Sequence, residues 1–148
     1  RLVHFFHTHD PGLGVPATSL LTKVQDDLKQ EGLFGTESEF YSITLDPGRD
    51  TPEALGDYAE RYGADPAGWK FLRGEEQEIH ELARRYGVAA LREEQGNIVQ
   101  AQVFLLIDKV GNYRKVLFVQ DFMDFGENGT PIHSHDAIVE EIKGLLEQ

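Results

Sequence analysis

The chain has 148 residues, a length typical of one domain, and 40% of them are hydrophobic, which excludes an intrinsically disordered protein. The 26 acidic and 14 basic residues give a formal net charge of −12, which argues against binding to nucleic acid or to anionic lipid. Cysteine is absent from the sequence. This excludes disulfides, thiolate metal sites and any cysteine nucleophile.

The first part of the chain alternates between short apolar runs and one amphipathic segment. Residues 2–6 (LVHFF) predict a buried strand, and the Gly- and Pro-rich stretch 7–16 after it predicts a loop. A helix is expected over 17–31, because apolar residues recur there at helical spacing. A second strand is expected over 40–45.

The rest of the chain predicts three helices and a β-hairpin. Thr51-Pro52-Glu53 is typical of a helix start, since threonine can cap and proline suits the first helical position. The stretch 69–72 predicts a short extended segment. The further predicted elements are a helix up to residue 63, a helix over 75–86, hairpin strands over 102–107 and 113–119, and a last helix over 136–146.

The order strand, helix, strand, helix, helix, hairpin, helix begins with a βαβ crossover and then adds two antiparallel strands. It predicts an α/β, thioredoxin-like fold with a central mixed sheet of about four or more strands and helices on both faces. Because the sequence shows no repeat and no linker, we expect one domain over 1–148. The chain starts at Arg1 and enters an apolar run at once, so we expect a natural N-terminal segment to be missing.

The motif at residues 44–53, Thr-Leu-Asp-Pro-Gly-Arg-Asp-Thr-Pro-Glu, is similar to the signature of the Sco/SenC family. The resemblance continues through 58–66 and through 104–108 with Gly111. The family consists of thioredoxin-like proteins tied to copper delivery and cytochrome c oxidase assembly. The resemblance implies a respiratory oxidase subunit or assembly factor as partner. It also implies an extracytoplasmic location, periplasmic or membrane-anchored, with the anchor outside this chain.

The same resemblance implies a copper site that this sequence does not retain. The family uses a Cys-x-x-x-Cys loop after the first strand and a histidine just before the hairpin. Here the cysteine positions fall on Asp10 and on Gly14 or Val15, and the histidine position falls at about Gln100. None offers the soft ligand that Cu(I) favours. We therefore expect a redox-inactive binding or accessory protein, not an enzyme, with no catalytic residue and no resident cofactor.

Two His-x-His pairs support an alternative function, metal binding at a rebuilt site. Residues two apart in an extended segment point to the same side, so each pair can present two imidazoles together. In a thioredoxin-like topology both pairs are expected near one edge of the sheet. Such a site suits Zn(II), Cu(II) or Ni(II), so a copper or zinc ion is the expected ligand. The candidate ligands are His7, His9, Asp10, His133 and His135.

Several other polar residues are interpreted as structural. His4 shares a strand face with apolar residues and is expected in the core, whereas His80 is expected to be solvated. Asp46 is expected to bond the backbone of its own turn, Asp50 to cap the following helix, and Arg49 to pair with either.

Aromatic residues raise two further questions. Trp69 and Phe71 are expected in the core rather than in a ligand platform. A second group lies near and beyond the last predicted strand, and two interpretations are equally supported: it covers the sheet edge, or it forms a partner-binding surface. This group is Phe118, Phe122, Met123 and Phe125.

Overall fold

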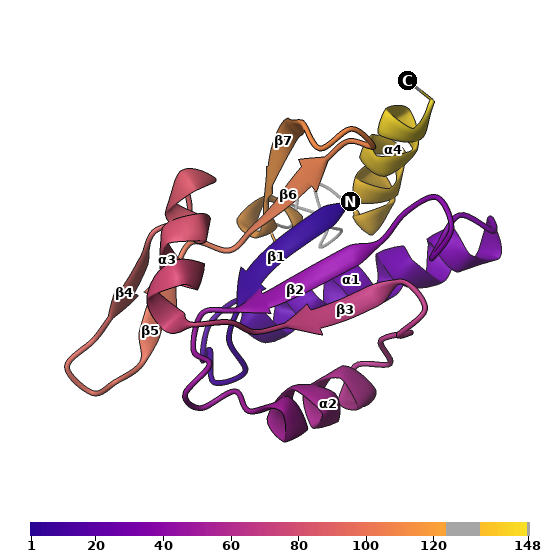
Figure 1. Cartoon of the computed structure of the whole chain (residues 1–148). Coiled ribbons are helices and arrows are strands. Elements are labelled where there is room, and N and C mark those ends of the chain that lie inside the picture. Colours follow the sequence, from indigo (N-terminus) through magenta and orange to yellow (C-terminus); the bar gives the residue numbers. More distant parts are fainter. Residues whose placement is uncertain (124–133, 148) are drawn as a thin grey trace, which may run out of the picture.

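The computed structural model describes residues 1–123 and 134–147, and a five-stranded sheet forms the centre of this part (Figure 1). The strand order is β3-β2-β1-β6-β7. β1 pairs in parallel with β2, and β2 with β3, whereas β6 runs antiparallel to both β1 and β7. The strands are β1 (Leu2–Phe6), β2 (Phe40–Thr44), β3 (Trp69–Leu72), β6 (Val103–Ile107) and β7 (Tyr113–Phe118). The predicted mixed sheet is confirmed.

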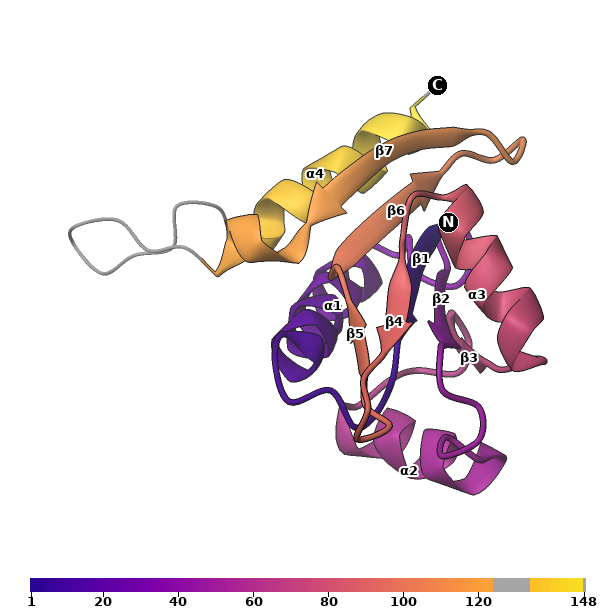
Figure 2. The same cartoon turned by 90° about the vertical axis from the view of Figure 1, so that its left-hand side faces the viewer.

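Helices cover both faces of this sheet, as predicted, and Figure 2 shows α1 and α3 on opposite sides of it. Every residue of β1 and β6 is buried, because neither face of the central strands meets water. The helical elements are α1 (Gly14–Gln30), α2 (Pro52–Arg61), α3 (Glu76–Arg85), the 3-10 helix η1 (Val119–Phe122) and α4 (His135–Leu146).

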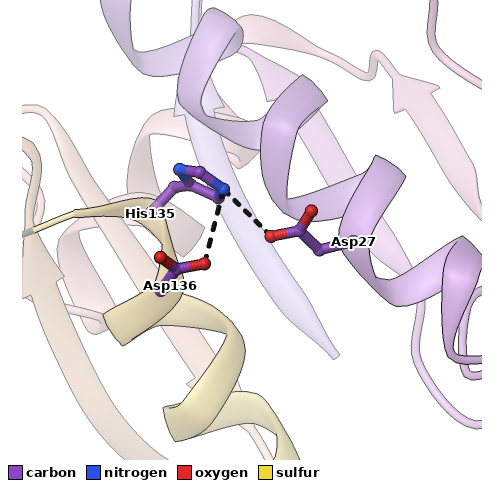
Figure 3. Close-up of side chains that lie close together, drawn as sticks. All are labelled: Asp27, His135 and Asp136. Atoms are coloured by element: carbon purple, nitrogen blue, oxygen red, sulfur yellow. Dashed lines mark hydrogen bonds and ion pairs between the residues drawn. The ribbon is translucent and has the colours of Figure 1, made fainter.

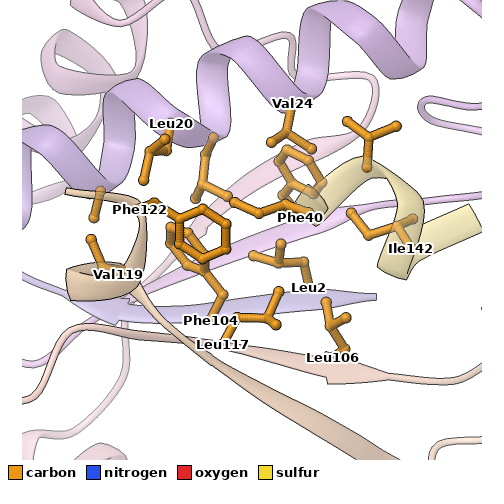
Figure 4. Packing of buried hydrophobic residues seen from close by; sticks show 14 of the residues in the cluster. Leu2, Leu20, Val24, Phe40, Phe104, Leu106, Leu117, Val119, Phe122 and Ile142 are labelled. Carbon is orange, nitrogen blue, oxygen red and sulfur yellow. The ribbon is translucent and has the colours of Figure 1, made fainter. Parts of the chain in front are cut away.

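Two apolar clusters hold the layers together. On one face, Phe40 and Phe104 of the sheet pack against α1 and α4, as Figure 4 shows with Leu20, Val24 and Ile142. On the other face the alternate strand residues pack against α3; they include Val3, Phe5, Ile43 and Leu105. Trp69 is 2% exposed and its Nε1 donates a hydrogen bond to Ser42 Oγ at 2.9 Å. The prediction that Trp69 is a core residue is confirmed.

Two elements differ from the sequence predictions. α1 begins at Gly14 rather than at residue 17, because Pro16 then lies in the first helical turn, where a missing backbone N–H costs nothing. A second hairpin, β4 (Ala90–Arg92) with β5 (Ile98–Gln100), was not predicted. Its strands have three residues each, too few to show an alternating pattern.

The C-terminal aromatic group divides between the two interpretations. Phe122 in η1 is 8% exposed and belongs to the core cluster, whereas Phe118 at the end of β7 is 53% exposed. Phe125 lies outside the described residues. One part of the group therefore covers the sheet and another part remains at the surface.

Over the residues that the structure describes, no helix combines the length and apolar character needed to cross a bilayer.

Candidate functional site

Asp10 lies in the loop between β1 and α1, and Gly14 and Val15 begin α1; these are the positions at which the sequence resemblance places the family's cysteines. Asp10 Oδ1 accepts a hydrogen bond from the Gly12 backbone N–H at 2.7 Å, which folds the loop on itself. Asp10 Oδ2 accepts another from Gln102 Nε2 at 2.5 Å, just before β6 begins. Gln102 Oε1 in turn accepts from His4 Nε2 at 2.8 Å inside the sheet. The result is a continuous polar chain from the loop through Gln102 into the core.

Gly14, one of the two candidates for the second cysteine position, has no side chain, and the loop uses that space. A Cβ atom built on Gly14 would lie 2.7 Å from Asp10 Cβ and 3.0 Å from Asp10 Oδ2. Real Cβ atoms do not approach this closely, and Asp10 Cβ is not the movable end of a side chain. The first turn of α1 therefore packs against Asp10 only because residue 14 is glycine.

Gln100 and Gln102, near the expected histidine position, bond different partners. Gln100 Nε2 donates to the Phe5 carbonyl in β1, while Gln102 contacts Asp10. The sequence resemblance placed the histidine position at about Gln100. The contact of Gln102 with Asp10 was not predicted. Because residues two apart in an extended chain share a side, the sequence alone could not distinguish them.

His4 is completely buried, as predicted, and its environment opposes protonation. Burial lowers the pKa of His4 from 6.5 to about 4, against the opposing effects of the Gln102 hydrogen bond and of the Asp10 charge. Gln102 Oε1 can only accept, so the proton of neutral His4 is assigned to Nε2. His4 Nδ1 is buried without a partner.

This shift predicts a pH dependence of stability. Between pH 6.5 and about 4 the unfolded state binds a proton at His4 that the folded state does not, so the free energy of unfolding should decrease as the pH falls. The full contribution is about 3 kcal/mol. Urea unfolding of the wild type and of His4→Gln across this range measures it. The loss should be much smaller in His4→Gln, and equal losses in the two proteins would contradict the assignment.

The structure does not bring His7 and His9 to one point. His7 is 1% exposed and its Nε2 lies 2.9 Å from the Ile98 carbonyl oxygen, so it joins the loop to β5. His9 is half-exposed, with Nδ1 3.2 Å from Thr8 Oγ1 and 3.7 Å from Asp50 Oδ1. One imidazole points to β5 and the other to Asp50. These contacts favour structural roles for both histidines.

His135 lies far from that loop, at the start of α4 and against the second half of α1 (Figure 3). Its Nε2 is 2.9 Å from Asp27 Oδ2 and 3.6 Å from Asp136 Oδ1. Asp27 is thirteen residues beyond Gly14, about 20 Å along the helix, so His135 does not share a site with His9 or Asp10. His133 lies outside the described residues.

One nitrogen and two carboxylates thus meet at His135, with ligand atoms within 4.8 Å of one another. The group lies at the N-terminus of α4, where the helix dipole opposes a cation and favours the Asp136 carboxylate. The arrangement attaches α4 to α1, which is a structural use of these side chains.

Asp50, in the turn after β2, holds the loop that carries Asp10. Asp50 is 0% exposed, and it accepts hydrogen bonds from the Thr8 backbone N–H at 3.1 Å, from Thr8 Oγ1 and from Thr44 Oγ1 at 2.6 Å. The expectation that Asp50 caps α2 is wrong, whereas the prediction that Thr51 can cap is confirmed, since Thr51 Oγ1 accepts from the Ala54 N–H at 3.2 Å. Asp50 instead fixes the loop after β1 to the end of β2.

Asp46 and Arg49 attach the unpredicted hairpin. Arg49 Nε donates to Asp46 Oδ2 at 2.6 Å, while its other nitrogens reach Gly96 and Asn97 at the tip between β4 and β5. Arg92 in β4 also lies 3.4 Å from Asp46 Oδ1. Burial alone would raise the pKa of Asp46, but Arg49 and Arg92 together hold it below its ordinary value. The expected bond of the Asp46 side chain to its own turn is replaced by these arginine contacts.

His80 corrects another prediction. It was expected to be solvated, but its Nε2 lies 2.6 Å from the Leu45 carbonyl oxygen, so it connects α3 to the chain leaving β2. The helical pattern placed His80 beside the apolar face, and that position was the available signal.

Comparisons with known proteins agree with this architecture. The family model described as SCO1/SenC matches residues 1–125. A SCO1 protein homolog of Bacillus subtilis is 28% identical over 145 residues, which cover 96% of this chain and 68% of the relative. The structure of a SCO1/SenC family lipoprotein from Bacillus anthracis has a TM-score of 0.80 at 23% identity, covering 97% of this chain and 79% of the other. Copper-bound ScoI of Arabidopsis thaliana has a TM-score of 0.74 at 23% identity, covering 99% and 83%.

Proposed function

Because this chain belongs to the SCO1/SenC family, we propose that it is a member that works by binding a protein partner, without carrying Cu(I) and without thiol redox chemistry. The family is linked to copper handling and cytochrome c oxidase assembly. The observation that carries the proposal is that the positions expected to bind copper offer no sulfur ligand. Asp10 is bonded to Gly12 and Gln102, and Gly14 has no side chain to offer.

The chemistry of these groups supports the loss of Cu(I) binding. Cu(I) is a soft ion that selects thiolate and thioether ligands, whereas the loop provides a carboxylate and amides. Thiol-disulfide exchange needs a sulfur nucleophile, and the sequence contains no cysteine. The proposed role is therefore non-enzymatic and depends on the surface of the fold rather than on a reacting group.

The partner that we propose is a cytochrome c oxidase subunit or an assembly factor, and the proposed location is extracytoplasmic, periplasmic or attached to a membrane. Family membership supports the partner. The description of one solved relative as a lipoprotein supports the location.

Competition for Cu(I) with a chromophoric chelator tests the proposal, with a family member that retains both cysteines as positive control. The purified chain should leave the chelator complex intact, and a Kd below about 1 μM would overturn the loss of Cu(I) binding. Crosslinking to purified cytochrome c oxidase tests the partner. A specific complex is expected, and failure to form one with the oxidase or its assembly factors would contradict the accessory role.

A further inference from the structure

A groove of about 480 Å³ opens beside Asp10, between the loop after β1, the strand β5 and the end of β7. Leu13, Val99 and Phe118 give it apolar walls, and the last two are 51% and 53% exposed. Among the described residues, none that lines this groove is a lysine, arginine or histidine. The groove therefore combines apolar surface with a carboxylate that has no cation beside it.

The Asp10 carboxylate can accept further hydrogen bonds in this groove. A carboxylate offers about four acceptor positions, and Asp10 uses two of them, for Gly12 and Gln102. Gln100 donates its Nε2 to the Phe5 carbonyl, and its Oε1 is buried with no hydrogen-bond partner. That oxygen has almost no accessible surface, so the acceptor open to a ligand in the groove is the Asp10 carboxylate, which can bond a ligand that supplies several donors.

We propose that this groove binds an arginine side chain presented by an apolar segment of a partner protein. A guanidinium group is planar and carries five N–H donors, so it can bond the Asp10 carboxylate while it stacks on the Phe118 ring. The apolar walls then contact the residues that flank the arginine. The net charge of −12 attracts such a segment over a longer distance.

This inference rests on the proposed function, because it names the kind of segment that a partner would insert. It commits to arginine rather than lysine, since only the guanidinium offers a flat face to Phe118 and paired donors to a carboxylate.

Blocked pentapeptides with arginine, lysine or glutamine between two leucines are suitable probes, followed by amide chemical shifts of the labelled chain. The arginine peptide should shift the amides of residues 10, 12, 13, 98–102 and 118, and should bind more tightly than the other two. Asp10→Asn keeps the size of the side chain but removes its charge, and it should weaken binding at least about tenfold. Phe118→Ser should also weaken it. Asp57→Asn removes the same charge from an exposed position of α2 and should leave binding unchanged.

Equal binding of the arginine and glutamine peptides, equal effects of Asp10→Asn and Asp57→Asn, or shifts outside the groove would overturn the inference. If free arginine amide bound as tightly as the peptide, the apolar walls would contribute nothing to binding, and that part of the inference would be wrong. Failure of this inference can be distinguished from failure of the proposed function. Oxidase binding that survives Asp10→Asn contradicts only the groove, while arginine peptide binding without any oxidase complex contradicts only the proposed partner.

Discussion

Replacing Asp10 and Gly14 together by cysteine is expected to convert this chain into a Cu(I)-binding protein. The two positions lie at the end of one loop and the start of α1, and they already face each other, because a Cβ on Gly14 would lie 2.7 Å from Asp10 Cβ. Two thiolates on this loop supply the soft ligands that Cu(I) selects. The gain should be at least about a hundredfold in Cu(I) affinity, since the wild type has no sulfur ligand there.

The loop has to widen for this to happen. Paired cysteines keep their Cβ atoms roughly 3.5–4.5 Å apart even in a disulfide, so the two backbones must separate by roughly 1 Å. Substituting Asp10 also removes the hydrogen bonds to Gly12 and Gln102 that close the loop, which makes this movement easier.

Cu(I) competition with the reduced variant measures the gain, and Asp10→Ser with Gly14→Ser is the matched control with oxygen in place of sulfur. Adding Gln100→His in one protein and Gln102→His in another shows which position supplies a third ligand. A folded, reduced cysteine variant that binds Cu(I) no better than the serine control would contradict the correspondence of these positions with the family's ligands.

The fold was predictable because its signals are local and repeated. The apolar run 2–6, the helix start at Thr51 and Pro52, and the turn at Gly111 each predicted an element that the structure contains. The hairpin of β4 and β5 was not predictable in this way. It is held by Arg49, which lies 47 and 48 residues before its partners Gly96 and Asn97, and such long-range contacts leave no pattern in a short strand.

The candidate site was predictable only in part, for a related reason. The sequence predicted His4 in the core, and the structure confirms it, while the resemblance placed the family's cysteine positions at Asp10 and at Gly14 or Val15. It could not indicate that His7 turns to β5, because the direction of a loop side chain depends on the neighbour it meets. His135 was expected near the first loop, but α4 packs along α1 and carries it to Asp27 instead.

Replacing Asp50 by alanine should strongly destabilise the fold. Its carboxylate is fully buried and serves three donors, the Thr8 N–H and the hydroxyls of Thr8 and Thr44. Removing it leaves buried donors unpaired and releases the loop that carries Asp10 from the end of β2. Each unpaired donor costs about 1–3 kcal/mol, so the free energy of unfolding should fall by about 3–5 kcal/mol.

Urea unfolding of Asp50→Ala, Asp50→Asn and Asp57→Ala distinguishes this buried network from a general effect of charge. Asp50→Asn keeps one acceptor oxygen and should lose about 1–2 kcal/mol, so it remains measurable even if the alanine variant fails to fold. Asp57 is exposed in α2, and its substitution should change stability by less than about 0.5 kcal/mol. If Asp50→Asn matched the Asp57 control, the carboxylate would not be what holds the loop. The position of the loop after β1 would then depend on the contact of His7 with β5, which His7→Phe would remove.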